Sequence, residues 1–455
     1  MPTPRTLRRR AQRQRAKDAA RGMMADIIYR LPPELQAKIH RRGLPFLTRL
    51  AFASICGASG HLLKPEAPWL VLPGTVEDGD EKATLISIAD GKAAKVRTPD
   101  PAMRGHVVLG SGGGWLVTAD ARGALRMANP ATGAQTDMPA ITTIPFLHSR
   151  NSAGDWIDLH VEPFLQFRFG GAPPPDDNTC SPIPSRTNTL TAAQMRQWFY
   201  RKVVLAASPR PENYTAMLIV ERPFSVPAFA TADDPKWRMA PSHDGVEDAV
   251  HHDGGFYSIT YSGVVEAWNR DAETGEFTST PVAAPRLAVV ECNDNKLLRK
   301  YLAVAPDGRL MAVLKATRKE EHNVYRSRNV TRVFFTVHVL DEAGERWEEE
   351  PDIGDAALFV GVNGSLCIST REHPGIIAGC VYYTDDEIGE ATVRHELRRP
   401  WDPYSRYRDV YGKDDNEELR FLGVYSLRNG TVERIADLEE RRCWPPAAWV
   451  TPSFL

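Results

Sequence analysis

The sequence contains no stretch of eighteen consecutive apolar residues, and its first residues lack the apolar core of a secretory signal peptide. A helix that crosses a bilayer needs about twenty such residues. We therefore expect a soluble intracellular protein, located in the nucleus, the cytoplasm or both, with no membrane partner.

Cysteine is scarce and dispersed. The chain has six cysteines and no CxxC pair, which argues against a disulfide scaffold and against a structural zinc site. We expect reduced, mostly buried thiols and neither a metal nor any other cofactor. The cysteines are Cys56, Cys180, Cys292, Cys367, Cys380 and Cys443.

An excess of charge is also absent, since the formal net charge is -2. Such a balance gives no general attraction for nucleic acid, which we do not expect as a partner. The exception is residues 5–17, where seven Arg or Lys occur without an acid. A flexible tail over residues 1–22 is the simplest interpretation; a nuclear-import or nucleic-acid patch and an Arg-rich presequence are alternatives.

Sequence signatures of catalysis are missing as well. We find no GxSxG elbow, HExxH pair, EF-hand loop or Cys/His nucleophile cluster. The glycine-rich "GSGGG" at 110–114 precedes a strand pattern, whereas a phosphate loop precedes a helix, so a hairpin turn is expected there. The sequence therefore predicts a non-enzymatic protein.

A short helical section is expected over residues 23–60. Leu31, Leu35 and Ile39 recur every four residues, and the pair Pro32-Pro33 fits the first turn of a helix. A second helix is expected after Pro45. These helices are too small to fold well alone.

The remainder of the chain, residues 61–455, contains a repeated unit. Residues 107–133 and 249–275 share a pattern of three strands separated by glycine turns, in which Gly114-Trp115 aligns with Gly255-Phe256. Further copies are expected at 203–237, at 301–316 with 332–350, and at 358–370 with 420–435.

Repeated sheets of three or four short strands predict a mainly β protein, a β-propeller of about six to eight blades. A pair of β-sandwiches is the alternative. Most tryptophans fall in or beside strand patterns, where they are expected to pack between blades. These are Trp69, Trp115, Trp237, Trp268, Trp347 and Trp449.

Two segments interrupt the repeats. Residues 170–189 are rich in Pro, Asp, Ser and Thr and are expected to form a mobile loop. After this loop, Thr191 and Gln194 have the spacing of a capping box, which predicts a short helix. The second interruption is a charged insert at 385–418, whose aromatic residues are a possible partner-binding surface: Trp401, Tyr404 and Tyr407.

A metal-dependent enzyme is a further alternative. In a strand, His251 and Asp253 would point to the same side and with His338 or His373 would resemble a two-histidine, one-carboxylate iron site. The matching place in the first copy is Gly110 to Gly112. A turn or strand edge is therefore the preferred interpretation.

The helical section and the repeats together resemble a known family. Residues 31–56, "LPPELQAKIHRRGLPFLTRLAFASIC", look like a degenerate F-box, and the repeats resemble the plant F-box proteins that carry a KIB-type β-propeller. That resemblance implies that the F-box docks on the Skp-type adaptor of a cullin ubiquitin ligase, while the propeller holds an unknown target protein. The matching adaptor-binding positions are Leu31, Pro32, Glu34, Leu35, Ile39, Leu44, Pro45, Phe46 and Leu47.

The F-box also departs from the family pattern. Gln36, Lys38 and His40 stand where apolar residues are usual, and the closing Trp is missing after Cys56. Each polar replacement on an adaptor-facing helix would remove about 1 to 3 kcal/mol of apolar burial. A substrate receptor of a ligase is therefore the leading hypothesis, and a propeller interaction module with a decayed F-box is the second.

Overall fold

The structure is a computed structural model. It describes residues 26–40, single positions between 44 and 56, and residues 66–453 with gaps, of which the largest are 161–186 and 392–421. The described chain divides into a helical unit, up to Glu66, and a β unit, Ala67–Pro452. No helix among the described residues is both long and apolar enough to span a bilayer.

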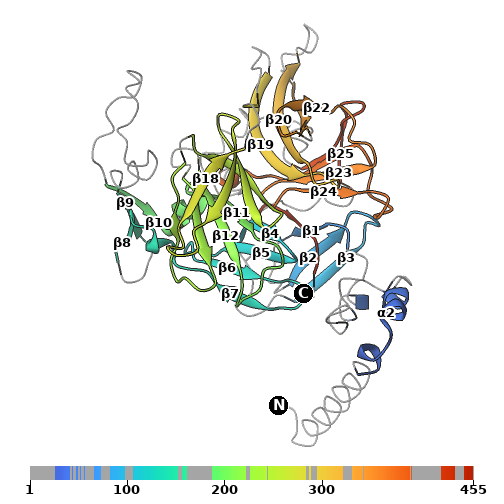
Figure 1. The fold of residues 1–455 in the computed structure, drawn as a ribbon, viewed down its shortest axis with the longest axis horizontal. Coiled ribbons are helices and arrows are strands. Elements are labelled where there is room, and N and C mark those ends of the chain that lie inside the picture. Colours follow the sequence, from blue (N-terminus) through green and yellow to red (C-terminus); the bar gives the residue numbers. More distant parts are fainter. Residues whose placement is uncertain are drawn as a thin grey trace, which may run out of the picture. The chain divides into compact units, whose positions relative to one another are not determined.

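The β unit is built from sheets of four or five short strands, which we call blades 1 to 6 (Figure 1). Blade 1 joins the last strand of the chain to the first three: β28 (Ala448–Val450), β1 (Trp69–Leu72), β2 (Lys82–Ser87) and β3 (Ala93–Arg97). Blade 2 consists of β4 (Val107–Gly112), β5 (Trp115–Ala119), β6 (Leu125–Ala128) and β7 (Gln135–Asp137). Blade 3 consists of β11 (Tyr200–Leu205), β12 (Thr215–Val220), β13 (Ala228–Thr231) and β14 (Arg238–Met239).

Blades 4 and 5 follow the same antiparallel order, whereas blade 6 has five strands, of which β23 and β25 pair in parallel. Blade 4 consists of β15 (Val246–His252), β16 (Gly255–Thr260), β17 (Val265–Arg270) and β18 (Phe277–Pro281). Blade 5 consists of β19 (Asn295–Val304), β20 (Leu310–Glu320), β21 (Val330–Leu340) and β22 (Trp347–Glu349). Blade 6 has the order β24 (Leu366–Ser369), β23 (Ala356–Val360), β25 (Cys380–Tyr383), β26 (Gly423–Ser426) and β27 (Val432–Glu433).

Successive blades contact one another in a closed series. The strand that heads the order of each blade lies beside the corresponding strand of the next blade. These neighbours are β28 and β4, β4 and β11, β11 and β15, β15 and β19, and β19 and β24. Blade 6 then packs on blade 1, since Phe359 and Tyr382 share an apolar cluster with Leu70 and Trp449. The predicted β-propeller is confirmed, and the described residues form six blades.

The two best repeat copies occupy equivalent places. Each begins with a two-residue hairpin in which both residues have positive φ, at Gly113-Gly114 in blade 2 and at Asp253-Gly254 in blade 4. Such turns favour Gly and Asp at these positions. The predicted alignment of Gly114 with Gly255 was wrong by one residue, because these turns pair Gly114 with Gly254.

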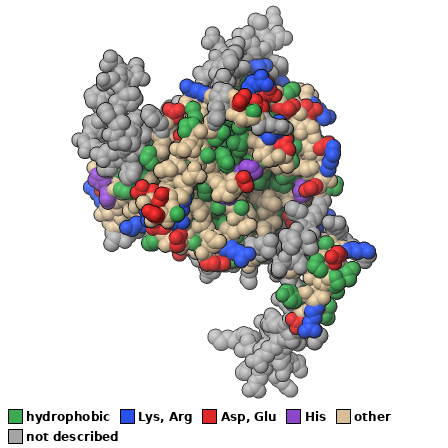
Figure 2. All heavy atoms as spheres, in the orientation of Figure 1, with side chains coloured by type: hydrophobic (Ala, Val, Ile, Leu, Met, Phe, Trp, Pro, Cys, Tyr) green, Lys and Arg blue, Asp and Glu red, His purple; other side chains and the backbone are tan. Residues whose placement is uncertain are grey.

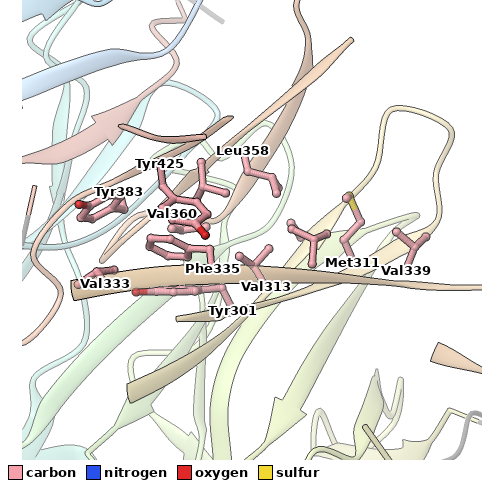
Figure 3. Close-up of a cluster of buried hydrophobic side chains, with 13 residues drawn as sticks. Tyr301, Met311, Val313, Val333, Phe335, Val339, Leu358, Val360, Tyr383 and Tyr425 are labelled. Carbon is pink, nitrogen blue, oxygen red and sulfur yellow. The ribbon is translucent and has the colours of Figure 1, made fainter. Parts of the chain in front are cut away.

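The core lies between the blades. In the cluster of Figure 3, side chains of β19, β20 and β21 face those of β23, β25 and β26, with Phe335 5.0 Å from Tyr383 and 5.4 Å from Tyr425 between ring centroids. Blades 3 and 4 meet in a similar way around Phe229, which stacks on Phe277 at 3.9 Å. Packing of this kind buries both faces of each sheet. Five of the six tryptophans predicted to pack are buried, and Trp347 is half-buried.

A separate three-stranded sheet lies between blades 2 and 3 in the sequence. It has the order β10 (Thr187–Thr191), β9 (Trp156–His160) and β8 (Leu147–Ser149). Helix α5 (Ala192–Trp198) follows, and the predicted capping box is present: Thr191 accepts from the Gln194 backbone N–H at 3.1 Å, while the Gln194 side chain accepts from Thr191 N–H at 2.9 Å.

The loop predicted at 170–189 needs a correction at its end. Residues 170–186 lie outside the described residues, and Thr187–Thr189 belong to β10. Their pairing with Asp158–His160 of β9 overrides a composition that is typical of loops. Threonine is also a favourable strand residue because of its branched Cβ.

The ring depends on its last strand. Trp449 in β28 is fully buried and lies edge-on to Phe359 and Tyr382, at 5.2 and 6.2 Å between ring centroids. Since β28 pairs with β1, the two ends of the β unit meet within one sheet. Loss of this contact should weaken the closure of the ring.

We predict that Trp449→Ala lowers the free energy of unfolding by about 3 to 5 kcal/mol, the usual cost of removing a buried Trp. Urea denaturation followed by circular dichroism measures this change. Trp198→Ala is the matched control, because Trp198 is 47% exposed. Equal losses in the two variants would show that β28 has no special role in stability.

Candidate partner-binding site

The first candidate surface lies on the helical unit. Helix α2 (Pro33–His40) begins with a proline, which suits the first helical position, and has Glu34 in its first turn and Lys38 in its last. These charges complement the helix dipole. The F-box-like segment therefore contains the helix that the sequence predicts.

One side of α2 faces the interior of the helical unit. Gln36 is 1% exposed, and its Nε2 donates to the carbonyl oxygens of Ile28 at 2.9 Å and Leu31 at 3.2 Å. His40 is also buried and lies 6.2 Å from Phe52 between ring centroids. Of the three polar residues that differ from the F-box pattern, Gln36 and His40 therefore point inward, and only Lys38 is exposed.

The other side of α2 is exposed and partly apolar. On α2 itself, Leu35 is 46% exposed and Glu34 is exposed, and of the residues that precede the helix, Ile27 is 55% exposed, Tyr29 68%, and Pro32 is exposed as well. Figure 2 shows apolar side chains at the surface around α2, among charged ones. Leu31 and Ile39 are half-buried. Large apolar groups at a surface are a common sign of a protein contact.

The other predicted adaptor-binding residues are only partly described. Leu44 is half-buried against the cluster of Phe52 and Cys56, and its carbonyl accepts from Arg49 Nη1 at 2.7 Å. Arg49 also pairs with Glu66 at 2.6 Å. Pro45, Phe46 and Leu47 lie outside the described residues.

The second candidate surface is the charged insert of the propeller. Trp401, Tyr404 and Tyr407 lie outside the described residues, but the first residues of the insert, Asp385–Gly389, are described. They follow β25 and reach α5, because a Cβ on Gly389 would come within 2.6 Å of the Trp198 ring. The start of the insert thus links blade 6 to the helix that precedes blade 3.

A network of buried charges fixes this start. Asp386 pairs with Arg299 of β19 at 2.6 Å and with Lys315 of β20 at 3.5 Å, and it accepts a hydrogen bond from the Tyr301 hydroxyl at 2.7 Å. Burial alone would raise the pKa of Asp386, but the two cations and the Tyr301 hydroxyl hold it well below its ordinary value. Asp386 is therefore ionised and paired in the folded protein.

The network continues through the first strands of blades 3, 4 and 5. Lys202 of β11 pairs with Asp248 of β15 at 2.5 Å, and Lys300 of β19 pairs with Glu247 of β15. Asp248 also accepts from the Leu302 backbone N–H at 2.9 Å. Burial lowers the pKa of Lys202, and the carboxylate of Asp248 opposes that shift. Charge pairs of this kind join blade 4 to both its neighbours.

On each of these three strands the network uses two charged residues that are adjacent in the sequence, and the strand pairing is interrupted beside them. The pairing shifts between Tyr200 and Lys202, between Val246 and Asp248, and between Leu297 and Arg299. Such bulges re-aim side chains. Sequence reasoning missed this network, although its signal is visible in "YRKVV", "VEDAV" and "LRKYL" (200–204, 246–250 and 298–302), where charges interrupt apolar strands.

The middle of the ring is filled by a turn of blade 6. Residues 361–365 connect β23 to β24; the Gly364 N–H donates to Ser111 O of blade 2 at 3.1 Å, and Ser365 Oγ donates to Asp248 of blade 4 at 3.3 Å. Val362 and Asn363 are fully buried. The turn of blade 6 is therefore held to both blade 2 and blade 4.

His251 and Asp253, considered from the sequence as part of an iron site, lie at the end of a strand and in the turn that follows it. His251 is the next-to-last residue of β15, and its Nδ1 accepts from the Ala207 backbone N–H at 3.2 Å, while Asp253 lies in the hairpin turn. In the part of the chain that the structure describes, no three His, Cys, Asp or Glu side chains are grouped to hold a metal ion. The two-histidine, one-carboxylate hypothesis at this place thus finds no support.

We predict that Asp386→Asn lowers the free energy of unfolding by about 3 to 5 kcal/mol, because Lys315 then stays buried without the carboxylate it pairs with, and Arg299 keeps only the partly exposed Glu387 as a counter-charge. Denaturant titrations at pH 7 measure the loss. Asp137→Asn removes a surface partner of Arg126 and should change stability by about 1 kcal/mol or less.

The lowered pKa of Asp386 also predicts how the stability loss in Asp386→Asn depends on pH. Because the pKa of Asp386 is lowered, its contribution is complete above the ordinary carboxyl pKa of about 3.9 and is lost as pH falls further. The stability difference between the native protein and Asp386→Asn should be constant from pH 7 to about pH 5 and shrink in stronger acid. A difference that does not depend on pH would contradict the ionised state of Asp386.

The chain is similar in part to several known proteins. An F-box protein of Arabidopsis thaliana, At2g17036, is 26% identical over 223 residues, which cover 46% of this chain and 45% of that protein. The aligned part thus spans about half of that relative. Among solved structures, the propeller domain of Cps50 (Swd1) from Myceliophteria thermophila covers 56% of this chain and 76% of its own, at 12% identity and a TM-score of 0.21.

A Bacteroides uniformis protein described as a 6-phosphogluconolactonase covers 59% of this chain and 99% of its own, at 13% identity and a TM-score of 0.19. Likenesses at such TM-scores carry no argument about function. The family model of the KIB1-4 beta-propeller, in contrast, matches residues 85–426, which is more than half of the chain and includes strands of all six blades. The protein belongs to the KIB1-4 β-propeller family.

Proposed function

We propose that the protein is the substrate-recognition subunit of a cullin-type ubiquitin ligase of the nucleus or cytoplasm. In this role the helical unit binds the Skp-type adaptor, the propeller holds a target protein, and the transfer chemistry belongs to other subunits. The observation that carries the proposal is the combination, in one chain, of an F-box-like helix with exposed apolar side chains and a KIB1-4 propeller.

Adaptor binding by α2 is supported by its two-sided character. Its inner face holds Gln36, which donates to two backbone carbonyls, and His40, which lies near Phe52, so the exposed Leu35 of α2 and the preceding Ile27 and Tyr29 lie outside the core of the helical unit. Leu35, Ile27 and Tyr29 can be buried by a partner without disturbing that core. Burial of one such side chain contributes about 1.5 to 3 kcal/mol.

Target binding is assigned to the charged insert. Its first residues are held by Asp386 on blade 5 and lie against Trp198, so the insert leaves the propeller from a fixed point. The aromatic residues Trp401, Tyr404 and Tyr407 are of the type that dominates protein contacts. Because the middle of the ring is filled by the turn at 361–365, we place the target on the insert rather than at the centre.

We expect Leu35→Asp in the full-length protein to weaken retention of a purified Skp-type adaptor by about tenfold or more, since one buried apolar contact is lost and a charge is introduced. Ile377→Asp, an equally exposed apolar position of the propeller at 52%, should retain the adaptor. A pull-down with graded adaptor concentrations separates the two. If the unchanged protein retains no adaptor, the F-box has decayed and the propeller acts without a ligase.

For the target, we expect the triple variant Trp401→Ala, Tyr404→Ala, Tyr407→Ala to lose target proteins that co-purify with the unchanged full-length protein from its own cells. Each aromatic contact at the centre of an interface contributes about 2 kcal/mol or more. The adaptor should still co-purify, which serves as the internal control. Retention of the same targets by the triple variant would remove the insert from the proposed site.

A further inference from the structure

Two histidines share the outer face of the sheet β8–β9–β10. His148 of β8 lies opposite Asp158 of β9, and His160 follows Asp158 by two positions, so the three side chains are on one side of the sheet. Ile157 and Leu159, which alternate with them, are buried. In Figure 2, histidine side chains are visible at the left edge of the molecule, over β8 and β9.

The two imidazole rings are close enough to bind one ion. Their centroids are 4.8 Å apart, and the rings meet edge to face at 73°. His148 is exposed and His160 is half-buried, so water and ions reach the pair. Imidazole nitrogen is a favoured ligand of zinc, copper and nickel.

Neighbouring hydroxyl groups orient the site. Thr187 Oγ1 lies 3.2 Å from His160 Nδ1, which leaves Nε2 as the ring nitrogen available to a ligand. The Thr189 hydroxyl donates to Asp158 Oδ1 at 2.6 Å and so fixes the carboxylate beside the rings. A hydrogen bond to the second ring nitrogen is a regular feature of histidines that bind metal.

We propose that His148 and His160 bind one divalent ion of the zinc type, with water molecules at the remaining positions and Asp158 as the adjacent carboxylate. Two protein nitrogens give an exchangeable site at the surface, in contrast to the three or four protein ligands of catalytic and structural zinc sites. This agrees with the finding that no group of three ligands stands ready among the described residues. The inference is independent of the proposed ligase role.

The chain offers a matched control in its other histidine pair, His251 and His252. There, Nδ1 of His251 already accepts a hydrogen bond from Ala207, and its ring lies edge-on to Phe256 at 5.0 Å. The pair at β8 and β9 differs because its two rings lie against each other, edge to face. Removal of His251 should therefore leave metal binding unchanged.

The test is equilibrium dialysis of the full-length protein against ZnCl2 at neutral pH, with bound zinc counted by atomic absorption. His148→Ala and His160→Ala should each lower the bound zinc by one ion per chain, while His251→Ala should bind as much as the unchanged protein. Thr187→Val should weaken zinc binding about tenfold, as expected for a lost partner of a ligand histidine. Circular dichroism checks that each variant is folded.

Two results would overturn the inference. One is a double variant, His148→Ala with His160→Ala, that is folded and binds as much zinc as the unchanged protein. The other is an unchanged protein that takes up no zinc in a saturable manner.

Discussion

Buried charges on the first strands of blades 3 to 5, together with Asp386 after β25, hold these neighbouring blades together. The pairs alternate in sign, from Arg201-Lys202 through Glu247-Asp248 to Arg299-Lys300, and Asp386 completes the series. A buried charge is costly unless it has a partner. Each of these charges is therefore favourably buried only beside the blade of opposite sign, a selectivity that the apolar clusters between the blades do not have.

The same network connects the scaffold to the proposed target site. Asp386 is at once a counter-charge for blade 5 and an early residue of the insert. The turn at 361–365 adds a second link, since Ser365 donates to Asp248. The turn in the middle of the ring and the start of the insert are therefore both bonded to the same charge network, the turn through Asp248 and the insert through Asp386.

Much of the propeller could be predicted from the sequence because its signals are local. Glycine turns such as Gly113-Gly114, the capping box of Thr191 and Gln194, and the strands of the repeats depend on residues close together in the chain. The charge network could not be predicted, because Lys202 and Asp248 meet only when two separate blades are placed side by side. Likewise, Gln36 looks like a defect of an F-box until the carbonyl groups of Ile28 and Leu31 are seen to accept its hydrogen bonds.

Closure of blade 1 by β28 has a consequence for biosynthesis. Strand β1 is made early, yet its partner at 448–450 is among the last parts of the propeller to be translated. At ribosomal speeds of about 5 to 20 residues per second, one edge of β1 waits roughly 20 to 75 seconds for that partner. A nascent chain with an open, apolar strand edge invites wrong pairing, so newly made protein should depend on chaperones until translation is complete.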